Sequence, residues 1–298
     1  MFDRAIKGWT LFKETFGILR REKSLMAFPV LSGVCILIAL VFLFFPVLFV
    51  FRSEGFNPDS MTTTGWITWV AVLFVIYLVI AFISSFFKAG IVSNATAVID
   101  GNDPALMDGI KASAANAGRI FVWSLIAATV GLVLRLLRNQ KSGAGQVIGD
   151  IVSLIAGAAW ELATFFVIPV MIFEHKNAFS AIKESGSLFR QTWGETVVAG
   201  FSFAFVYIPF MLFLAGTFFS LATENTTVIA SMGALTIIIF AITAILISAL
   251  QAILVALMYN YAKTGEISSK VDKNLITNSF TEKHTVQNKG FNYTGGNI

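Results

Sequence analysis

Long apolar stretches separated by short polar segments make up most of the sequence, and six of them are long enough to cross a membrane. A helix rises about 1.5 Å per residue, so roughly 20 apolar residues are needed to span about 30 Å of hydrocarbon. No stretch shows the polar–apolar alternation of a membrane-barrel strand, and each is therefore expected to be a helix. The predicted spans cover residues 26–51, 65–87, 119–137, 146–173, 196–222 and 227–260.

The composition supports a membrane protein. Hydrophobic residues make up 56% of the 298 residues and charged residues 13%, whereas soluble domains carry about 25% charged residues. After residue 263 the chain turns polar and loses any apolar period. The predicted fold class is all-α: a polytopic transmembrane helical bundle over residues 1–263, followed by a flexible polar tail over residues 264–298.

The distribution of positive charge predicts the orientation of the bundle. The first apolar stretch is too long for a signal peptide and no small-residue cleavage site follows it, so it is expected to be the first span. Six spans place both termini on one side, and that side carries 17 of the 21 lysine and arginine residues. The positive-inside rule then places both termini in the cytoplasm, although Arg135, Arg138 and Lys141 fall on the outer side.

Three segments that each precede a pair of spans share an Ile-Lys step and a helical polar–apolar pattern. They lie at residues 5–12, 109–113 and 181–189. Their spacing is unequal, so they reflect either a threefold repeat of one unit or the general likeness of amphipathic helices. In both cases we expect a cytoplasmic helix in the membrane plane before each pair of spans.

The first of these helices has the clearest amphipathic pattern. Apolar residues recur at every third or fourth position from Phe2 to Leu19 and form one stripe, with basic residues on much of the remaining surface. Such a helix either lies among lipid headgroups with its rings in the acyl boundary, or seals the rim of the bundle. The candidate lipid contacts are Trp9, Phe12, Lys13, Arg20 and Arg21 and, in the third segment, Trp193.

Glu161 is the one carboxylate predicted near the middle of a span. Gly149, Ser153 and Gly157 precede it at steps of four, and small residues at that spacing let another helix approach closely. Because a buried charge is costly, the Glu161 side chain either stays protonated within this contact or forms a proton- or cation-coupled site. No intramembrane basic partner is evident. Ser153 and Glu161 are therefore the candidate intramembrane polar site.

Motifs for catalysis are absent from the sequence. His175 and His284 are the two histidines and Cys35 is the single cysteine, which excludes a three-histidine or cysteine-rich metal site. There is no phosphate-binding loop, dinucleotide fingerprint or nucleophile elbow, and the loops are too short for a catalytic domain. We expect no enzyme activity, no catalytic residue, no cofactor or metal, and no nucleic-acid partner.

A likeness to known membrane proteins is carried by these segments: Lys7–Trp9 with Leu25–Pro29, Trp160–Val170, Glu174, Ala181–Ser185, Leu188–Phe189 and Thr192–Glu195. Over most of its length before the tail, the chain resembles a family of prokaryotic six-span membrane proteins that is known only as a domain of unknown function. The resemblance implies a bacterial or archaeal origin and a plasma (inner) membrane location, and it conveys no reaction, substrate or catalytic residue.

These patterns favour a non-catalytic function. We expect a membrane-organising or accessory subunit that contacts lipid and other membrane proteins or a second copy of itself. The main alternative is a small transporter or channel with Glu161 in its pathway. A lipid-modifying enzyme is a third class, and it has the least support because no acid–base or metal constellation can be assembled.

Overall fold

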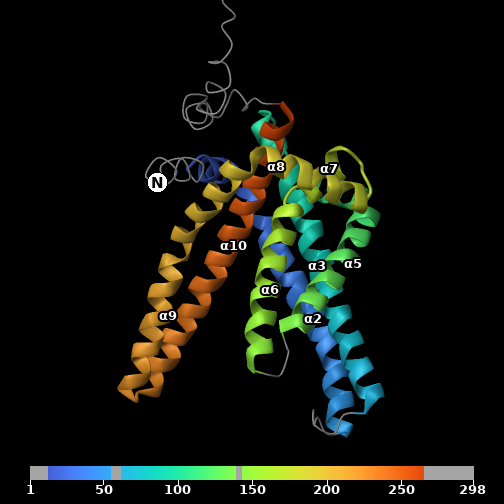
Figure 1. Ribbon diagram of the computed structural model, residues 1–298. Helices are drawn as coiled ribbons and strands as arrows, with labels where there is room; N and C mark the ends of the chain where they lie inside the picture. The colour runs from blue at the N-terminus through green and yellow to red at the C-terminus, as the bar shows by residue number, and fades with distance from the viewer. Residues whose placement is uncertain (1–12, 55–61, 139–142, 265–298) are drawn as a thin grey trace, which may run out of the picture.

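The structure is a computed structural model that describes residues 13–54, 62–138 and 143–264 (Figure 1). Within these residues the chain is helical and contains no strand, as predicted. Residues 13–21 form a helix that precedes the first 3-10 turn. The remaining elements, in chain order, are η1 (Lys23–Met26), α2 (Ala27–Glu54), α3 (Thr63–Ile99), α4 (Leu106–Ala115), α5 (Ala117–Arg138), α6 (Gly143–Ala163), α7 (Val167–Phe173), α8 (Ala178–Ser202), η3 (Phe203–Tyr207), α9 (Ile208–Ser220), η4 (Leu221–Thr223) and α10 (Thr226–Thr264).

Six helical stretches in the described part of the chain are long and apolar enough to cross a membrane, which confirms the predicted class. They pair as three hairpins, because α2 packs on α3, α5 on α6, and α9 on α10. A further helix precedes each hairpin: residues 13–21, α4 and α8. The order of elements therefore matches the predicted unit of one helix followed by two spans.

Several helices extend beyond the predicted spans, and α3 is the simplest case. The second span was predicted to end at residue 87, whereas the helix that carries it continues to Ile99 and has 37 residues. The bilayer sets where apolar residues are needed, whereas this helix continues because its last turns are buried against other helices. Ala89, Val92 and Ala95 are among the buried residues of that segment.

The fourth predicted span, residues 146–173, is broken into α6 and α7. The break lies at 164–166, where the backbone N–H of Phe166 donates a hydrogen bond to the hydroxyl of Ser185 at 2.9 Å instead of continuing the helix. The fifth predicted span, residues 196–222, is also divided. There α8 continues to Ser202, and α9 begins after η3 with a proline in its first turn, where the missing N–H is tolerated.

The buried core lies at one end of the molecule, which we call the core end. It contains α4, α7 and the last turns of α3 and α10, and α7 is buried from Val167 to Ile172. We call the opposite end, where α2 and α5 end, α3 and α6 begin and η4 lies, the open end. The α9–α10 hairpin diverges from the other helices toward the open end (Figure 1). Helix–helix packing is thus concentrated where the helices converge.

Small residues bring α3 and α4 together at the core end. A Cβ atom on Gly109 would lie 2.7 Å from the Gly90 carbonyl oxygen, so the two backbones are in direct contact. The Asn94 side chain donates to the Ala105 carbonyl at 3.0 Å, and the Ser113 hydroxyl donates to the Phe86 carbonyl at 2.7 Å. Close backbone approach with polar side chains bridging to carbonyls is a common way to join helices in a membrane.

Candidate functional site

A groove of about 950 Å³ lies between α3, α5 and α6. It includes both residues that the sequence singled out as an intramembrane polar site, Ser153 and Glu161. The groove has polar and apolar walls. Its lining residues are Tyr77 from α3; Gly131, Leu134 and Arg135 from α5; and Asp150, Ile151, Ser153, Leu154, Gly157, Ala158 and Glu161 from α6.

The polar stripe of α6 forms one wall of this groove. Asp150, Ser153, Gly157 and Glu161 recur at steps of three and four, so they share one helix face over about 16 Å. Ser153 is buried, and its hydroxyl donates to the Asp150 carbonyl at 3.0 Å. The predicted tight helix contact along this face is wrong. A Cβ on Gly157 would meet only a Leu134 methyl at 3.9 Å, an ordinary contact distance.

Arg135 is a groove residue, although it was predicted to lie on the outer side. It belongs to α5, and its guanidinium donates a hydrogen bond to the Tyr77 hydroxyl at 3.3 Å. Arg135 lies three residues before the end of α5 and one residue before the end of the candidate span Ala117–Leu136, and its side chain is exposed.

Lys88 is a basic residue whose charge attracts that of Glu161. It lies on α3, eleven residues after Tyr77 and therefore on the same helix face. The two side chains, both in the described part of the chain, form no direct ion pair. Lys88 lies one residue beyond the predicted second span, so this charge comes from a helix that is distant from Glu161 in sequence.

Glu161 lies near the last turn of α6, which ends at Ala163. The candidate membrane span continues through the break to Phe173, so Glu161 is in the middle of the span Gly149–Phe173, as predicted. Its side chain is exposed and faces the groove, and within the described residues it makes no hydrogen bond. The neighbouring Trp160 stacks on Trp123 of α5, with ring centroids 5.8 Å apart, which holds this part of α6 in place.

The groove carries opposite charges along its length. Arg135 and Asp150 lie toward the open end, while Glu161 faces it near the core end with Lys88 nearby. Within the described residues, no group of three or more histidine, cysteine, aspartate or glutamate side chains could hold a metal ion. Ionisable residues inside a membrane bundle commonly mark a path or a binding site for charged groups. The arrangement is therefore suited to binding ions, protons or charged headgroups.

The structure describes the side chains of three of the six residues that were predicted to contact lipid. Lys13, Arg20 and Arg21 are exposed on the helix at residues 13–21. The apolar stripe is divided, because Phe16 is 43% exposed whereas Leu19 is 2% exposed and packs in the core. Trp9 and Phe12 lie outside the described residues, as do the side chain of Trp193 and the predicted tail from residue 265 onward.

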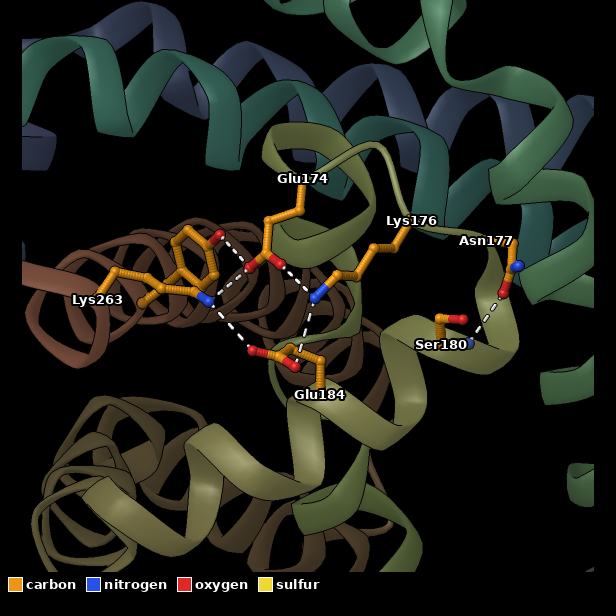
Figure 2. Close-up of polar contacts among 7 residues, drawn as sticks. Glu174, Lys176, Asn177, Ser180, Glu184 and Lys263 are labelled. Carbon is orange, nitrogen blue, oxygen red and sulfur yellow. Dashed lines mark hydrogen bonds and ion pairs between the residues drawn. The ribbon is translucent and has the colours of Figure 1, made fainter.

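A second polar cluster, which the sequence analysis did not single out, joins α10 to the segment between α7 and α8 (Figure 2). The Glu174 carboxylate contacts the ammonium groups of Lys176 at 2.7 Å and Lys263 at 2.9 Å. Glu184 contacts the same two lysines, at 3.4 and 3.1 Å. The Tyr259 hydroxyl donates to Glu174 at 2.9 Å. We call these five residues the ion network.

The ion network changes the proton affinity of its carboxylates. Burial alone would raise the pKa of Glu174, but hydrogen bonds from Lys176, Lys263 and Tyr259 outweigh it and hold that pKa at about 2. The hydrogen bond from Lys263 likewise lowers the pKa of Glu184. The positive and negative charges of the network neutralise each other. Its contacts join the end of α10 to the segment after α7 and to the first turns of α8.

The residues that carry the sequence resemblance lie mainly in the packing of the core end. Ser185 binds the backbone at the α6–α7 break, Glu174 and Glu184 belong to the ion network, and Trp160 forms the stacked pair. Leu188 and Phe189 are buried in the same core. The resemblance therefore reflects residues that pack this end of the fold. Because Glu174 and Glu184 are among them, the resemblance was the sequence feature that pointed to the ion network.

The fold and the groove define an all-α membrane protein with a charged groove between three of its membrane-length helices. The chain belongs to a family of unknown function, DUF6159, which matches residues 67–269 and thus more than half of the chain. The match covers all three helices of the groove and the ion network, and it begins after the N-terminal segments of the resemblance. No curated protein matches the chain.

Proposed function

We propose that this protein is a non-catalytic membrane-organising or accessory protein that contacts lipid and other membrane proteins. One observation carries the proposal: outside the core end, large apolar side chains on all three hairpins are exposed. Phe42 of α2 is 75% exposed, Leu154 of α6 is 73% exposed and Phe219 of α9 is 78% exposed. Contiguous exposed apolar surface is typical of sites that lipid or other proteins cover.

The α9–α10 hairpin supports a contact role most strongly. Within the described residues, α9 packs mainly on α10 and on its flanking 3-10 turns. The hairpin is held together by its own polar contacts, because the Thr217 and Thr236 hydroxyls are 2.7 Å apart and Thr236 also donates to the Phe213 carbonyl. The faces of α9 that point away from α10 carry exposed apolar side chains such as Leu212 and Phe219, and they can accept lipid, a membrane protein or a second copy.

Site-specific photo-crosslinking tests this proposal. A photoreactive phenylalanine analogue replaces Leu154 or Phe219 in the full-length protein, with Met171 in the buried core as the matched control. In native membranes the exposed positions are expected to give adducts of discrete protein mass as well as lipid adducts, and Met171 neither. Lipid adducts alone at both exposed positions would contradict a protein partner.

We further propose a plasma (inner) membrane location with the core end in the cytoplasm. The support is the charge distribution, since 17 of the 21 lysine and arginine residues lie on the side that carries both termini. Single cysteines at Ser60 and Ser269, introduced after removal of Cys35, test the orientation with a membrane-impermeant thiol reagent. We expect labelling at residue 60 from outside intact cells, and labelling at residue 269 would invert the assignment.

A second candidate function is a small transporter or channel, and the charged groove favours it. Lys88, Arg135, Asp150 and Glu161 place two positive and two negative side chains within or beside one groove. Such charges are costly in a membrane unless they face water, a ligand or one another. Glu161 is the residue expected to bind the transported cation or proton, because it is exposed to the groove.

Flux measurements with purified protein in vesicles separate the two candidates. The transporter predicts proton or cation movement that Glu161→Gln abolishes while the helical content is retained. Glu224→Gln, at the open end outside the groove, is the control variant. Absence of any Glu161-dependent flux supports the accessory function, whereas Glu161-dependent flux would replace it.

A further inference from the structure

The Arg135 side chain is exposed to the groove and has donor groups to spare. Within the described part of the chain, its guanidinium makes one hydrogen bond, to the neutral Tyr77 hydroxyl at 3.3 Å, and no ion pair. A guanidinium has five donor groups in a planar fork, so most of them are left for a further ligand. Asp150 lines the same groove but forms no ion pair with Arg135 among the described residues, and the fork can therefore bind an additional anion with several acceptor oxygens.

The walls of the groove indicate what kind of molecule carries that charge. Leu134, Ile151 and Leu154 line it, and the last two are 52% and 73% exposed, so an apolar chain could lie along α6. The Tyr77 hydroxyl accepts the bond from Arg135 and keeps its own proton to donate to a second acceptor. The combination of a cation, a hydroxyl donor and an apolar wall matches an anionic amphiphile better than a bare ion.

We propose that this groove is a phospholipid-binding site. The lipid phosphate accepts hydrogen bonds from the Arg135 guanidinium and the Tyr77 hydroxyl, and an acyl chain lies against Ile151 and Leu154. A phosphate offers two oxygens to the guanidinium fork, which is the geometry that arginine binds best. This inference deepens the proposed function, because it assigns the lipid class and the residues that recognise it.

Native mass spectrometry of the purified protein tests the site. The probes are phosphatidylglycerol and a diacylglycerol with the same acyl chains, which differ in the phosphate headgroup. Wild-type protein is expected to bind phosphatidylglycerol at least about tenfold more tightly, and Arg135→Gln to remove most of this preference. Arg135→Lys is expected to keep part of it, since the charge remains and the fork is lost. Tyr77→Phe is expected to have a smaller effect.

Two further variants keep the test independent of folding and of net charge. Arg119→Gln removes a cation from the same helix outside the groove, where its guanidinium contacts Asn116, and it is expected to leave lipid binding unchanged. Gly157→Leu fills the groove without a change of charge, because a Cβ there meets only ordinary contacts, and it is expected to reduce phospholipid binding. Thermal unfolding confirms that each variant is folded.

Three results would overturn the phospholipid site. Equal binding of phosphatidylglycerol and diacylglycerol would exclude recognition of the phosphate, and so would unchanged binding by Arg135→Gln. Displacement of phosphatidylglycerol by an equal concentration of palmitate would assign the groove to a carboxylate amphiphile instead. Failure of this site is distinguishable from failure of the proposed function, because crosslinked protein adducts at Phe219 do not depend on Arg135.

Discussion

The ring of Phe28 occupies the space in which a side chain on Gly90 would lie. A Cβ atom at Gly90 would be 2.5 Å from one ring carbon of Phe28 and 3.2 Å from the Gly109 carbonyl oxygen. Phe28 itself is fully buried. The helices α2, α3 and α4 therefore meet at a point where only glycine fits, and this point lies in the core that supports the groove.

Replacement of Gly90 by Ala is expected to destabilise the protein by about 1–3 kcal/mol, because the ring of Phe28 or the α4 backbone must move. Unfolding of the detergent-solubilised protein measures the effect. Gly118→Ala is the control, since a Cβ there has open space and alanine favours the helix, so its effect should be neutral or stabilising by up to about 1 kcal/mol. Equal stability of the two variants would contradict the close contact.

The bond between Phe166 and Ser185 gives a second prediction. Ser185→Ala leaves the buried N–H of Phe166 without its acceptor and is expected to cost about 1–3 kcal/mol. Ser180→Ala, an exposed position on the same helix, is expected to change stability by less than about 0.5 kcal/mol. The free energy of unfolding distinguishes them. A Ser185 variant as stable as the Ser180 variant would show that the helix break does not depend on this bond.

The ion network predicts a loss of stability in acid. The pKa of Glu174 is lowered from 4.5 to about 2, so its contribution is complete above about pH 4.5 and disappears as the pH falls toward 2. The shift corresponds to at most about 3 kcal/mol. Unfolding between pH 6 and pH 2 measures this slope, which Glu174→Gln should reduce and Glu224→Gln should preserve. A slope that survives in Glu174→Gln would assign it to other groups.

The attraction between Lys88 and Glu161 predicts non-additive mutational effects. Lys88 is poorly solvated, so removal of the Glu161 charge takes away an attraction that favours the charged lysine, whereas removal of both charges avoids this cost. The destabilisation by the double variant is therefore expected to be smaller than the sum of the destabilisations by Lys88→Met and Glu161→Gln alone. The expected difference, which is the coupling free energy, is about 0.5–3 kcal/mol. Unfolding of the four proteins of the cycle measures it, and additive effects would show that the two charges act independently.

The length of the apolar stretches along the chain was sufficient to predict the helical class and the number of membrane-length helices. It could not give the ends of α3 and α6. A span prediction reports where residues tolerate hydrocarbon, whereas helix ends depend on contacts such as the one between Phe166 and Ser185. Ser153 and Glu161 were identified because small and charged residues are conspicuous in an apolar stretch, and the structure places both in one groove.

The sequence by itself determined that this chain forms apolar helices, because every backbone polar group in a membrane must be satisfied within its own segment. It also marked Glu161 as an unusual charge. Only the tertiary structure decided which charges act together, since Lys88, Arg135 and the ion network depend on helices that are far apart in sequence. Electrostatic and packing energies depend on distance in space, which the linear order of residues does not contain.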